Sequence, residues 1–313
     1  MSTDTPPAAE ALRGSNWGRW GESDERGTLN LITDEKRLAD LGTPRTGRVF
    51  SLGKELLRQP SSVGDYRTPF QRTTLASQSD EAFWEAMAER MGTPAPGTGA
   101  NEDVVITPTH NGTHMDALCH VYDDGSLYNG FPRESFTSLG GAQRNSIHRV
   151  GGIVGRGVLL DVATYLGVDW LEPSFHIESA LLEEVRAAQG TRIRPGDVVL
   201  IRTGHGEAVA YAKKMGEEPP RMQPGLGLAS MDFFDACEPA AVGADNSAVE
   251  CIPCEERFLS VHVQLIVRRG IHLIENLDLS ELAAANCRDF FFVAAPLKIV
   301  GGTGSPINPI AIG

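Results

Sequence analysis

The chain has 313 residues, with 28 Lys and Arg against 41 Asp and Glu, so its formal net charge is −13. This acidic balance argues against nucleic acid or an anionic membrane as a partner, because both attract clustered Lys and Arg. No stretch approaches the roughly 20 apolar residues of a membrane-spanning helix, and residues 1–10 lack the pattern of a signal peptide. The five cysteines do not form the dense, even set of a secreted disulfide framework. We therefore expect a cytoplasmic protein with reduced thiols.

The predicted elements alternate between helices and strands along the chain. The apolar patterns predict helices over residues 34–41 (with Thr33 as the N-cap), 79–91, 177–189, 231–237 and 258–269. They predict strands at 104–106, 155–162, 197–202, 241–245, 271–275 and 290–299. This interleaving favours an α/β fold around a mixed central sheet. We expect a flexible tail at 1–14 and a single domain over 15–313 that begins with an N-terminal extension.

A glycine-rich segment near the N-terminus contains Trp17 and Trp20. Such a segment more often packs over a core or a neighbouring subunit than lines a ligand pocket. Its aromatic surface favours a homo-oligomer, a dimer or a tetramer. Together with Phe70 and Phe131, the two tryptophans are candidate walls for a flat aromatic substrate, with ordinary packing as the simpler alternative for each.

Three of the eight histidines, His110, His114 and His120, fall within eleven residues that also contain Asp116. A helix would place His110 and His114 on one face, but residues 111–113 (Asn-Gly-Thr) are poor in a helix interior. In an extended strand His110, Gly112, His114 and Asp116 all point to one side, and the glycine leaves room between the ligands. Two imidazoles and a carboxylate then form a facial set for a divalent metal, with open positions for water and substrate. Unrelated histidines are the alternative, which is disfavoured because four ligand-type side chains so close together rarely serve packing.

The motif His110-x-Gly-Thr-His114-x-Asp116-x-x-x-His120 resembles the signature of the metal-dependent cyclase-like hydrolases. The resemblance covers most of the chain. It includes residues 16–21 (NWGRWG), 155–161 (GRGVLLD), 195–200 (PGDVVL) and 301–309 (GGTGSPINP). One departure is Leu118, which stands where the formamidase members of the family have proline.

The resemblance implies a single domain with a mixed sheet of the swivelling β/β/α type and a hydrolase that acts on a C–N bond of a small amide, formamide or lactam. His110, His114 and Asp116 would match the family's primary metal ligands, and His120 its catalytic histidine. His262 and Glu275 would hold a second ion, with Asp116 bridging the two ions. Alternatively, they would orient a metal ligand or the water through hydrogen bonds. The ligand set suits Zn²⁺ or Mn²⁺, as one ion or two.

The same residues leave other functions open. A divalent metal lowers the pKa of bound water to near ~7, and a histidine with a pKa near ~6.5 can return the proton to the leaving nitrogen. Hydrolysis of a lactone or ester could use the same site. A non-haem iron oxygenase would need two histidines and a carboxylate, which His114, Asp116 and His262 imitate, but it leaves His110 and His120 unexplained. A non-catalytic metal-binding relative is the third alternative.

Cys251 and Cys254 form the one Cys-x-x-Cys pair of the sequence. A thioredoxin-like context or a second pair would indicate redox or zinc chemistry, and the sequence has neither. We therefore predict a turn with two incidental thiols. The glycines of 301–304 do not match a phosphate-binding loop, and we predict a tight turn near the pocket.

Overall fold

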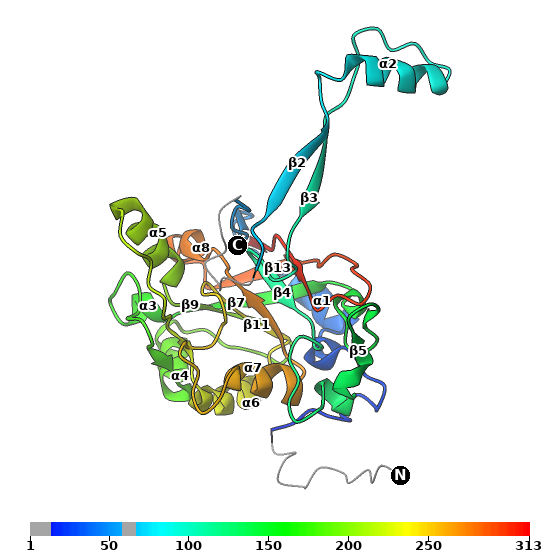
Figure 1. The fold of residues 1–313 in the computed structure, drawn as a ribbon. Helices are drawn as coiled ribbons and strands as arrows, with labels where there is room; N and C mark the ends of the chain where they lie inside the picture. Colours follow the sequence, from blue (N-terminus) through cyan, green and yellow to red (C-terminus); the bar gives the residue numbers. More distant parts are fainter. Residues whose placement is uncertain (1–13, 58–66) are drawn as a thin grey trace, which may run out of the picture. The chain divides into compact units, whose positions relative to one another are not determined.

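The computed structural model describes residues 14–57 and 67–313 (Figure 1). Apart from Gly14, the tail predicted at 1–14 lies outside these residues. The chain divides into two compact units. Residues 1–54 and 112–313 form the main unit, and residues 55–111 form a second unit, here termed the inserted unit.

A nine-stranded mixed sheet runs through the main unit, in the order β1-β15-β13-β7-β9-β11-β12-β4-β14. Its strands are β1 (Val49–Ser51), β15 (Ile310–Ile312), β13 (Asp289–Ala294), β7 (Ile153–Asp161), β9 (Val198–Arg202), β11 (Ala241–Ala244), β12 (His272–Glu275), β4 (His114–Asp116) and β14 (Gly304–Pro306). The four central strands β7, β9, β11 and β12 are parallel, and the remaining pairs are antiparallel. The mixed α/β sheet predicted from the sequence is therefore confirmed.

The central strands are buried on both faces. In β9, Val199 and Ile201 belong to one hydrophobic cluster, while Val198 and Leu200 belong to a second cluster on the opposite face. A strand covered on both sides reads as a continuous apolar run, because neither side chain orientation faces water. This is the reason that Val158–Leu160 in β7 and Val198–Ile201 in β9 are uninterrupted apolar runs and do not alternate with polar residues.

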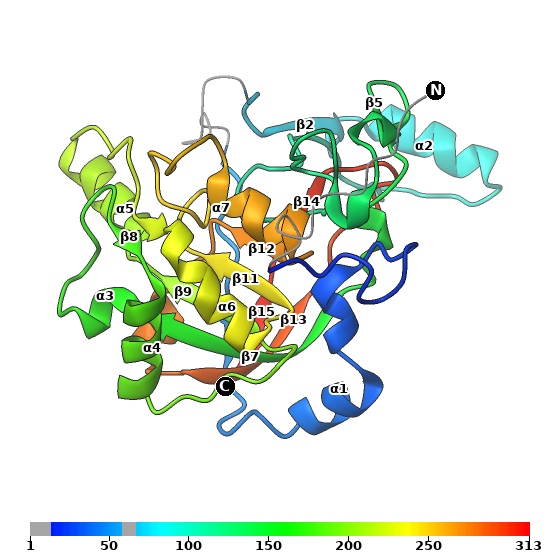
Figure 2. The ribbon, with the colours of Figure 1, turned by 90° about the horizontal axis from the view of Figure 1, so that it is seen from below.

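Helices of the main unit cover these faces. They are α1 (Asp34–Asp40), α3 (Val162–Tyr165), α4 (Ser179–Ala188), α5 (His205–Met215), α6 (Met231–Cys237), α7 (Ser260–His262) and α8 (Ser280–Ala284). Residues Val263–Arg268 continue α7 as a π-helical turn. Leu182 of α4 and Phe234 of α6 share a hydrophobic cluster with Val199 of β9, and the view in Figure 2 places α6 and α7 in front of the central strands. The predicted Thr33 cap of α1 is confirmed, since its side chain accepts a hydrogen bond from the Lys36 amide.

Short elements complete the main unit. The 3₁₀ turns are Gly27–Leu31, Tyr128–Gly130, Arg133–Ser135, Ile147–Arg149 and Leu228–Ser230. The short strands pair as β8 (His176–Ile177) with β10 (Gly225–Leu226) and β5 (Phe136–Thr137) with β6 (Gly141–Ala142). The strand predicted at 290–299 ends at Ala294, because Pro296 follows and has no amide hydrogen for the ladder.

The inserted unit contains a β-hairpin and a helix. Strands β2 (Gln71–Ala76) and β3 (Glu102–Ile106) pair antiparallel, and α2 (Glu81–Arg90) lies at the tip of the hairpin (Figure 1). The predicted helix at 79–91 and strand at 104–106 are confirmed. The sequence did not predict β2, whose side chains are exposed and largely polar. Among the described residues of both units, no helix is long and apolar enough to cross a membrane.

Candidate metal and catalytic site

Strand β4 supplies the first two residues of the site. His114 and Asp116 are two apart in the strand, so their side chains leave the same face, while Met115 between them enters the hydrophobic core. On one side β4 pairs with β12, where Glu275 is the register partner of His114. On its other side β4 pairs with β14, which begins at Gly304 of the glycine-rich closing string. The sheet thus brings together His114 and Glu275, which are 161 residues apart in the sequence, as cross-strand neighbours on one face.

The three side chains form a compact, fully buried group. His114 Nε2 lies 3.2 Å from Glu275 Oε2 and 3.6 Å from Asp116 Oδ1. One ligand atom from each of the three lies within 4.8 Å of the others. Imidazole nitrogen and carboxylate oxygen are donors that zinc and manganese accept, so the chemistry of this donor set fits a divalent metal.

The backbone before β4 orients His114. The extended conformation predicted for residues 110–116 is wrong before His114, because residues 109–113 form turns and bends and Gly112 has a φ of 62°. Glycine is suited to this left-handed backbone conformation because it has no Cβ. This is a second role for Gly112, besides the predicted one of leaving room between the metal ligands. The Gly112 carbonyl oxygen lies 2.9 Å from His114 Nδ1. A proton on Nδ1 satisfies this contact, and Nε2 is the ring nitrogen that faces the Glu275 and Asp116 carboxylates.

His262 and Glu250 extend the group from the other side. His262 Nε2 lies 3.2 Å from Glu275 Oε1 and 3.8 Å from Asp116 Oδ2, and its Nδ1 contacts Glu250. Glu250 also accepts a hydrogen bond of 3.2 Å from the Val261 amide at the start of α7. Sequence reasoning missed Glu250. Its signal was a charged residue inside the apolar segment Ala248–Cys251, a place where a carboxylate requires buried partners.

We term these five residues the acidic cluster: His114, Asp116, Glu250, His262 and Glu275. Burial alone would lower the pKa of His262, but the hydrogen bonds and charges of Glu250 and Glu275 raise it to about 10. Burial likewise opposes protonation of His114, and Glu275 and Asp116 outweigh it and raise the pKa. Burial and Asp116 act to raise the pKa of Glu275, yet the two histidines hold it below its usual range. Carboxylates therefore dominate the electrostatics of the cluster.

His120 lies at the edge of the acidic cluster. A turn follows β4, in which the His120 amide donates to the Ala117 carbonyl. The His120 ring centre is 6.4 Å from that of His262, and one of its ring nitrogens lies within 4.8 Å of an Asp116 carboxylate oxygen. Its side chain is only partly buried. His120 is therefore next to the cluster and not enclosed within it, as a proton carrier between buried groups and a substrate needs to be.

The other predicted residues occupy different surroundings. His110 and Phe70 belong to the inserted unit, so their roles as metal ligand and substrate contact stay predictions from the sequence. Trp17 packs on the core and its Nε1 donates to the Val267 carbonyl at 2.6 Å. Trp20 stacks under Arg19, with 4.8 Å between the guanidinium carbon and the ring centre, and Phe131 packs on the second core cluster. Contact of these aromatic rings with substrate also stays a prediction.

The Cys251/Cys254 pair and the glycines of 301–304 are the remaining motifs that the sequence singled out. Cys251 and Cys254 are free thiols, and burial raises the pKa of Cys251 to about 11. A thiol with a raised pKa is a poor nucleophile at neutral pH. The closing glycine string forms a turn at Gly301, with φ 75°, and its Thr303 carbonyl accepts the Ala117 amide directly after β4.

Comparison with known proteins places this arrangement among relatives. A family model described as "Putative cyclase" matches residues 49–251. The kynurenine formamidase of Delftia acidovorans is 26% identical over 231 residues, which cover 74% of this chain and 88% of that protein. The crystal structure of a novel cyclase superposes with a TM-score of 0.86 at 32% identity and covers 97% of this chain and 99% of its own. Isatin hydrolase A from Ralstonia solanacearum shares the fold, with a TM-score of 0.60 at 20% identity and 99% of both chains covered.

Proposed function

Because the chain belongs to the putative cyclase family, we propose that it is a metal-dependent hydrolase of a C–N bond in a small amide, formamide or lactam. The observation that carries the proposal is the buried set His114, Asp116 and Glu275, with ligand atoms within 4.8 Å of one another and His120 beside it. The relative named kynurenine formamidase supports an amide or formamide as the substrate class.

The acidic cluster would hold the metal. His114 and Asp116 are its first ligands, with His110 added from the sequence motif, and His262 and Glu275 hold a second ion or orient the first set. The donor set suits Zn²⁺ or Mn²⁺. Such a cation, when bound, lowers the pKa of a water to near ~7 and polarises the carbonyl under attack.

The residues of the chain then perform the positioning and the proton transfer. Gly112 fixes the orientation of His114, and Glu250 fixes that of His262, each through Nδ1, the ring nitrogen that does not face Asp116 and Glu275. His120 takes a proton from the attacking water through a ring nitrogen and delivers it to the leaving nitrogen, so that an amine and not an amide anion departs. Its partial exposure allows it to reach a substrate that the buried carboxylates do not contact.

A metal analysis combined with a substrate screen tests the proposal. The panel contains N-formyl aromatic amines, isatin-like lactams and unsaturated lactones. Replacement of His120 by Ala should leave the metal content unchanged and reduce kcat by about 10²–10⁴-fold. His148→Ala is the matched control, because His148 is partly buried and contacts Ser146 outside the cluster, and its kcat should stay within twofold of the wild type. Loss of metal from His120→Ala would show a ligand and contradict the shuttle role.

The same panel separates the other candidate reactions. Turnover of lactones alone would replace the C–N assignment by ester hydrolysis at the same residues. Product formation without oxygen excludes the iron oxygenase alternative, whereas oxygen consumption coupled to turnover would favour it. Stable metal binding with no turnover of any class would identify a non-catalytic relative.

A further inference from the structure

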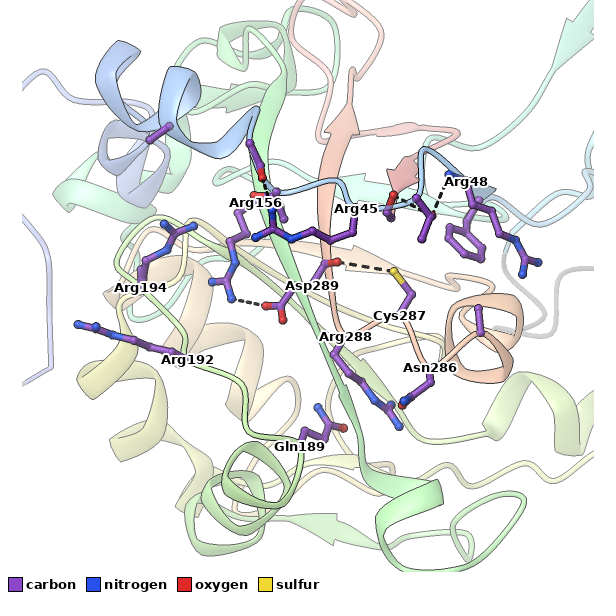
Figure 3. A pocket seen from close by; sticks show the side chains of 17 residues that line it. Arg45, Arg48, Arg156, Gln189, Arg192, Arg194, Asn286, Cys287, Arg288 and Asp289 are labelled. Carbon is purple, nitrogen blue, oxygen red and sulfur yellow. Dashed lines mark hydrogen bonds and ion pairs between the residues drawn. The ribbon is translucent and has the colours of Figure 1, made fainter.

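A second polar region lies on the opposite half of the sheet from the acidic cluster. It is a pocket of about 950 Å³ beside β1, β13 and β7, and strands β9 and β11 separate β7 from β12 of the acidic cluster. Six of its lining residues are arginines: Arg45, Arg48, Arg156, Arg192, Arg194 and Arg288. Figure 3 shows these side chains around the pocket, with Arg48 and Arg192 turned outward on opposite sides of the view. Asp289 is the one carboxylate side chain among the lining residues.

Most of these arginines already have carboxylate partners behind the pocket wall. Arg156 pairs with Asp197 and Asp289, and Arg194 donates to Asp40 at 2.9 Å. Lys36 joins Asp40 and Asp197, so three cations meet three carboxylates. Arg288 contacts Asp161 at 3.2 Å, and Asp161 is shared with Arg202, which also binds Glu207. These groups balance one another and form the wall of the pocket.

The guanidinium groups of Arg45 and Arg192 are not part of these ion pairs. Among the described residues, neither Arg45 nor Arg192 has a carboxylate within salt-bridge distance, and the one hydrogen bond of Arg45 goes to the neutral carbonyl of Gly42 at 3.2 Å. The C-terminal end of α1 contributes roughly half a negative charge at most, and a carboxylate at Gly313 would offset one charge. Arg48 forms an exposed pair with Glu281 at 3.4 Å, which contributes little, and its guanidinium carbon lies 4.5 Å from the Phe50 ring centre. The pocket therefore keeps a positive excess on a chain whose net charge is −13.

From this geometry we propose that the pocket binds a small phosphorylated metabolite with at least two negative charges. Guanidinium groups bind phosphate oxygens through paired hydrogen bonds, and the volume falls within the roughly 300–1,000 Å³ of small-molecule sites. Thr43, Thr46, Gln189 and Asn286 also line the pocket, so it offers neutral polar groups to the ligand beside the guanidinium groups.

Isothermal titration of the full chain with fructose 1,6-bisphosphate, inorganic phosphate and uncharged fructose tests the proposal at low ionic strength. We expect the bisphosphate to bind more tightly than phosphate, and fructose to give no binding. The double variant Arg45→Gln/Arg192→Gln should weaken bisphosphate binding at least tenfold. The matched control Arg90→Gln/Arg221→Gln has the same net charge and removes exposed arginines outside the pocket, so its affinity should stay within twofold of the wild type.

Three results would overturn the proposal. The first is no bisphosphate binding up to millimolar concentration, and the second is equal loss of affinity in both double variants, which would indicate general charge attraction. The third is loss of binding in Asp116→Asn with the pocket intact, which would place the anion at the acidic cluster. Binding of polyglutamate without binding of the bisphosphate would identify an acidic polypeptide as the partner and exclude the metabolite.

Discussion

Two buried polar groups on different parts of one sheet are built on opposite electrostatic principles. In the acidic cluster at β4 and β12, Glu250 and Glu275 pair with imidazoles, and no Lys or Arg of the described residues lies within salt-bridge distance of either. At β7, by contrast, Asp40 and Asp197 each contact the Lys36 ammonium, at 2.9 and 2.7 Å, and also meet arginines. We term this second group, Lys36, Asp40, Arg156, Arg194 and Asp197, the paired cluster.

The difference indicates what each cluster is for. A buried carboxylate is costly unless a cation and hydrogen bonds compensate it. The paired cluster carries its own permanent cations, so it is complete as a structural element. The acidic cluster relies on two titratable histidines whose pKa values are raised by their carboxylate neighbours. It is the arrangement expected of a site that also binds a cation from solution.

The largest effect should come from neutralising the acidic cluster. Asp116→Asn removes a charged ligand, and we expect the metal content to fall to background and kcat/KM to fall by at least about 1,000-fold. Because Asn keeps the shape of the side chain, the fold should persist. Metal analysis and circular dichroism on the same preparation check both expectations, and full metal occupancy in the variant would remove Asp116 from the ligand set.

The corresponding change in the paired cluster should act on stability alone. Asp197→Asn removes the buried carboxylate that Lys36 and Arg156 share, so that Asp40 and Asp289 are left to balance three cations, and we expect a loss of about 3 kcal/mol in the free energy of unfolding. Metal content should be unchanged, as measured on the folded protein. If Asp197→Asn lost metal as Asp116→Asn does, the two clusters would not be functionally distinct.

A smaller effect is expected from the positioning residue of the acidic cluster. Glu250 contacts His262 Nδ1 and accepts hydrogen bonds from the Val261 and His262 amides of α7. Glu250→Gln keeps the size of the side chain but weakens the orientation of His262, so metal affinity should fall by about 10–100-fold. Competition with a chelator gives this affinity, and an unchanged value would limit Glu250 to capping α7.

The smallest effect concerns His272, a buried histidine next to the cluster that hydrogen-bonds to a backbone carbonyl. His272 lies on β12, and its Nδ1 contacts the Asp116 backbone carbonyl at 2.8 Å. Burial outweighs this hydrogen bond and lowers the pKa of His272 to about 4, whereas His262 shifts upward. The unfolded chain, with an ordinary pKa of about 6.5, then binds a proton that the folded chain does not.

The contribution of His272 to stability should therefore be constant above pH 6.5 and decrease as the pH falls toward 4. By pH 5.5 the loss is about 1 kcal/mol. Chemical unfolding of the wild type and His272→Gln at pH 7.5 and 5.5 measures it, as the part of the pH dependence that the variant lacks. An identical pH dependence in both proteins would contradict the shift of His272.

The sequence predicted the secondary structure correctly where a local apolar pattern determines it. The apolar runs identified β7 and β9, because burial on both faces of a central strand leaves a strong apolar signal. Helix α6 has the predicted bounds at 231–237. His114 and Asp116 were found from their spacing. The resemblance suggested Glu275 only as part of a second ion site or as an orienting residue, and the pairing of His114 with Glu275 was not predicted, because strand order is set by tertiary contacts.

Three other features were not predicted from the sequence, each for a physical reason. The turn at 109–113 breaks the two-residue period on which the His110–Asp116 alignment rested, and Gly112 permits that turn. Helix α5 went unrecognised because its eleven residues (His205–Met215) bury only Ala212 and so give a weak apolar pattern. Glu250 lies outside any motif and acquires its role only when α7 folds over β12.

Anomalous diffraction from crystals grown with Mn²⁺ or Zn²⁺ tests the central claim most directly. We predict an anomalous peak about 2.0–2.3 Å from His114 Nε2 and an Asp116 carboxylate oxygen, and no comparable peak at the paired cluster. Absence of a peak at His114 and Asp116 under saturating metal, or a peak bound elsewhere, would contradict the account.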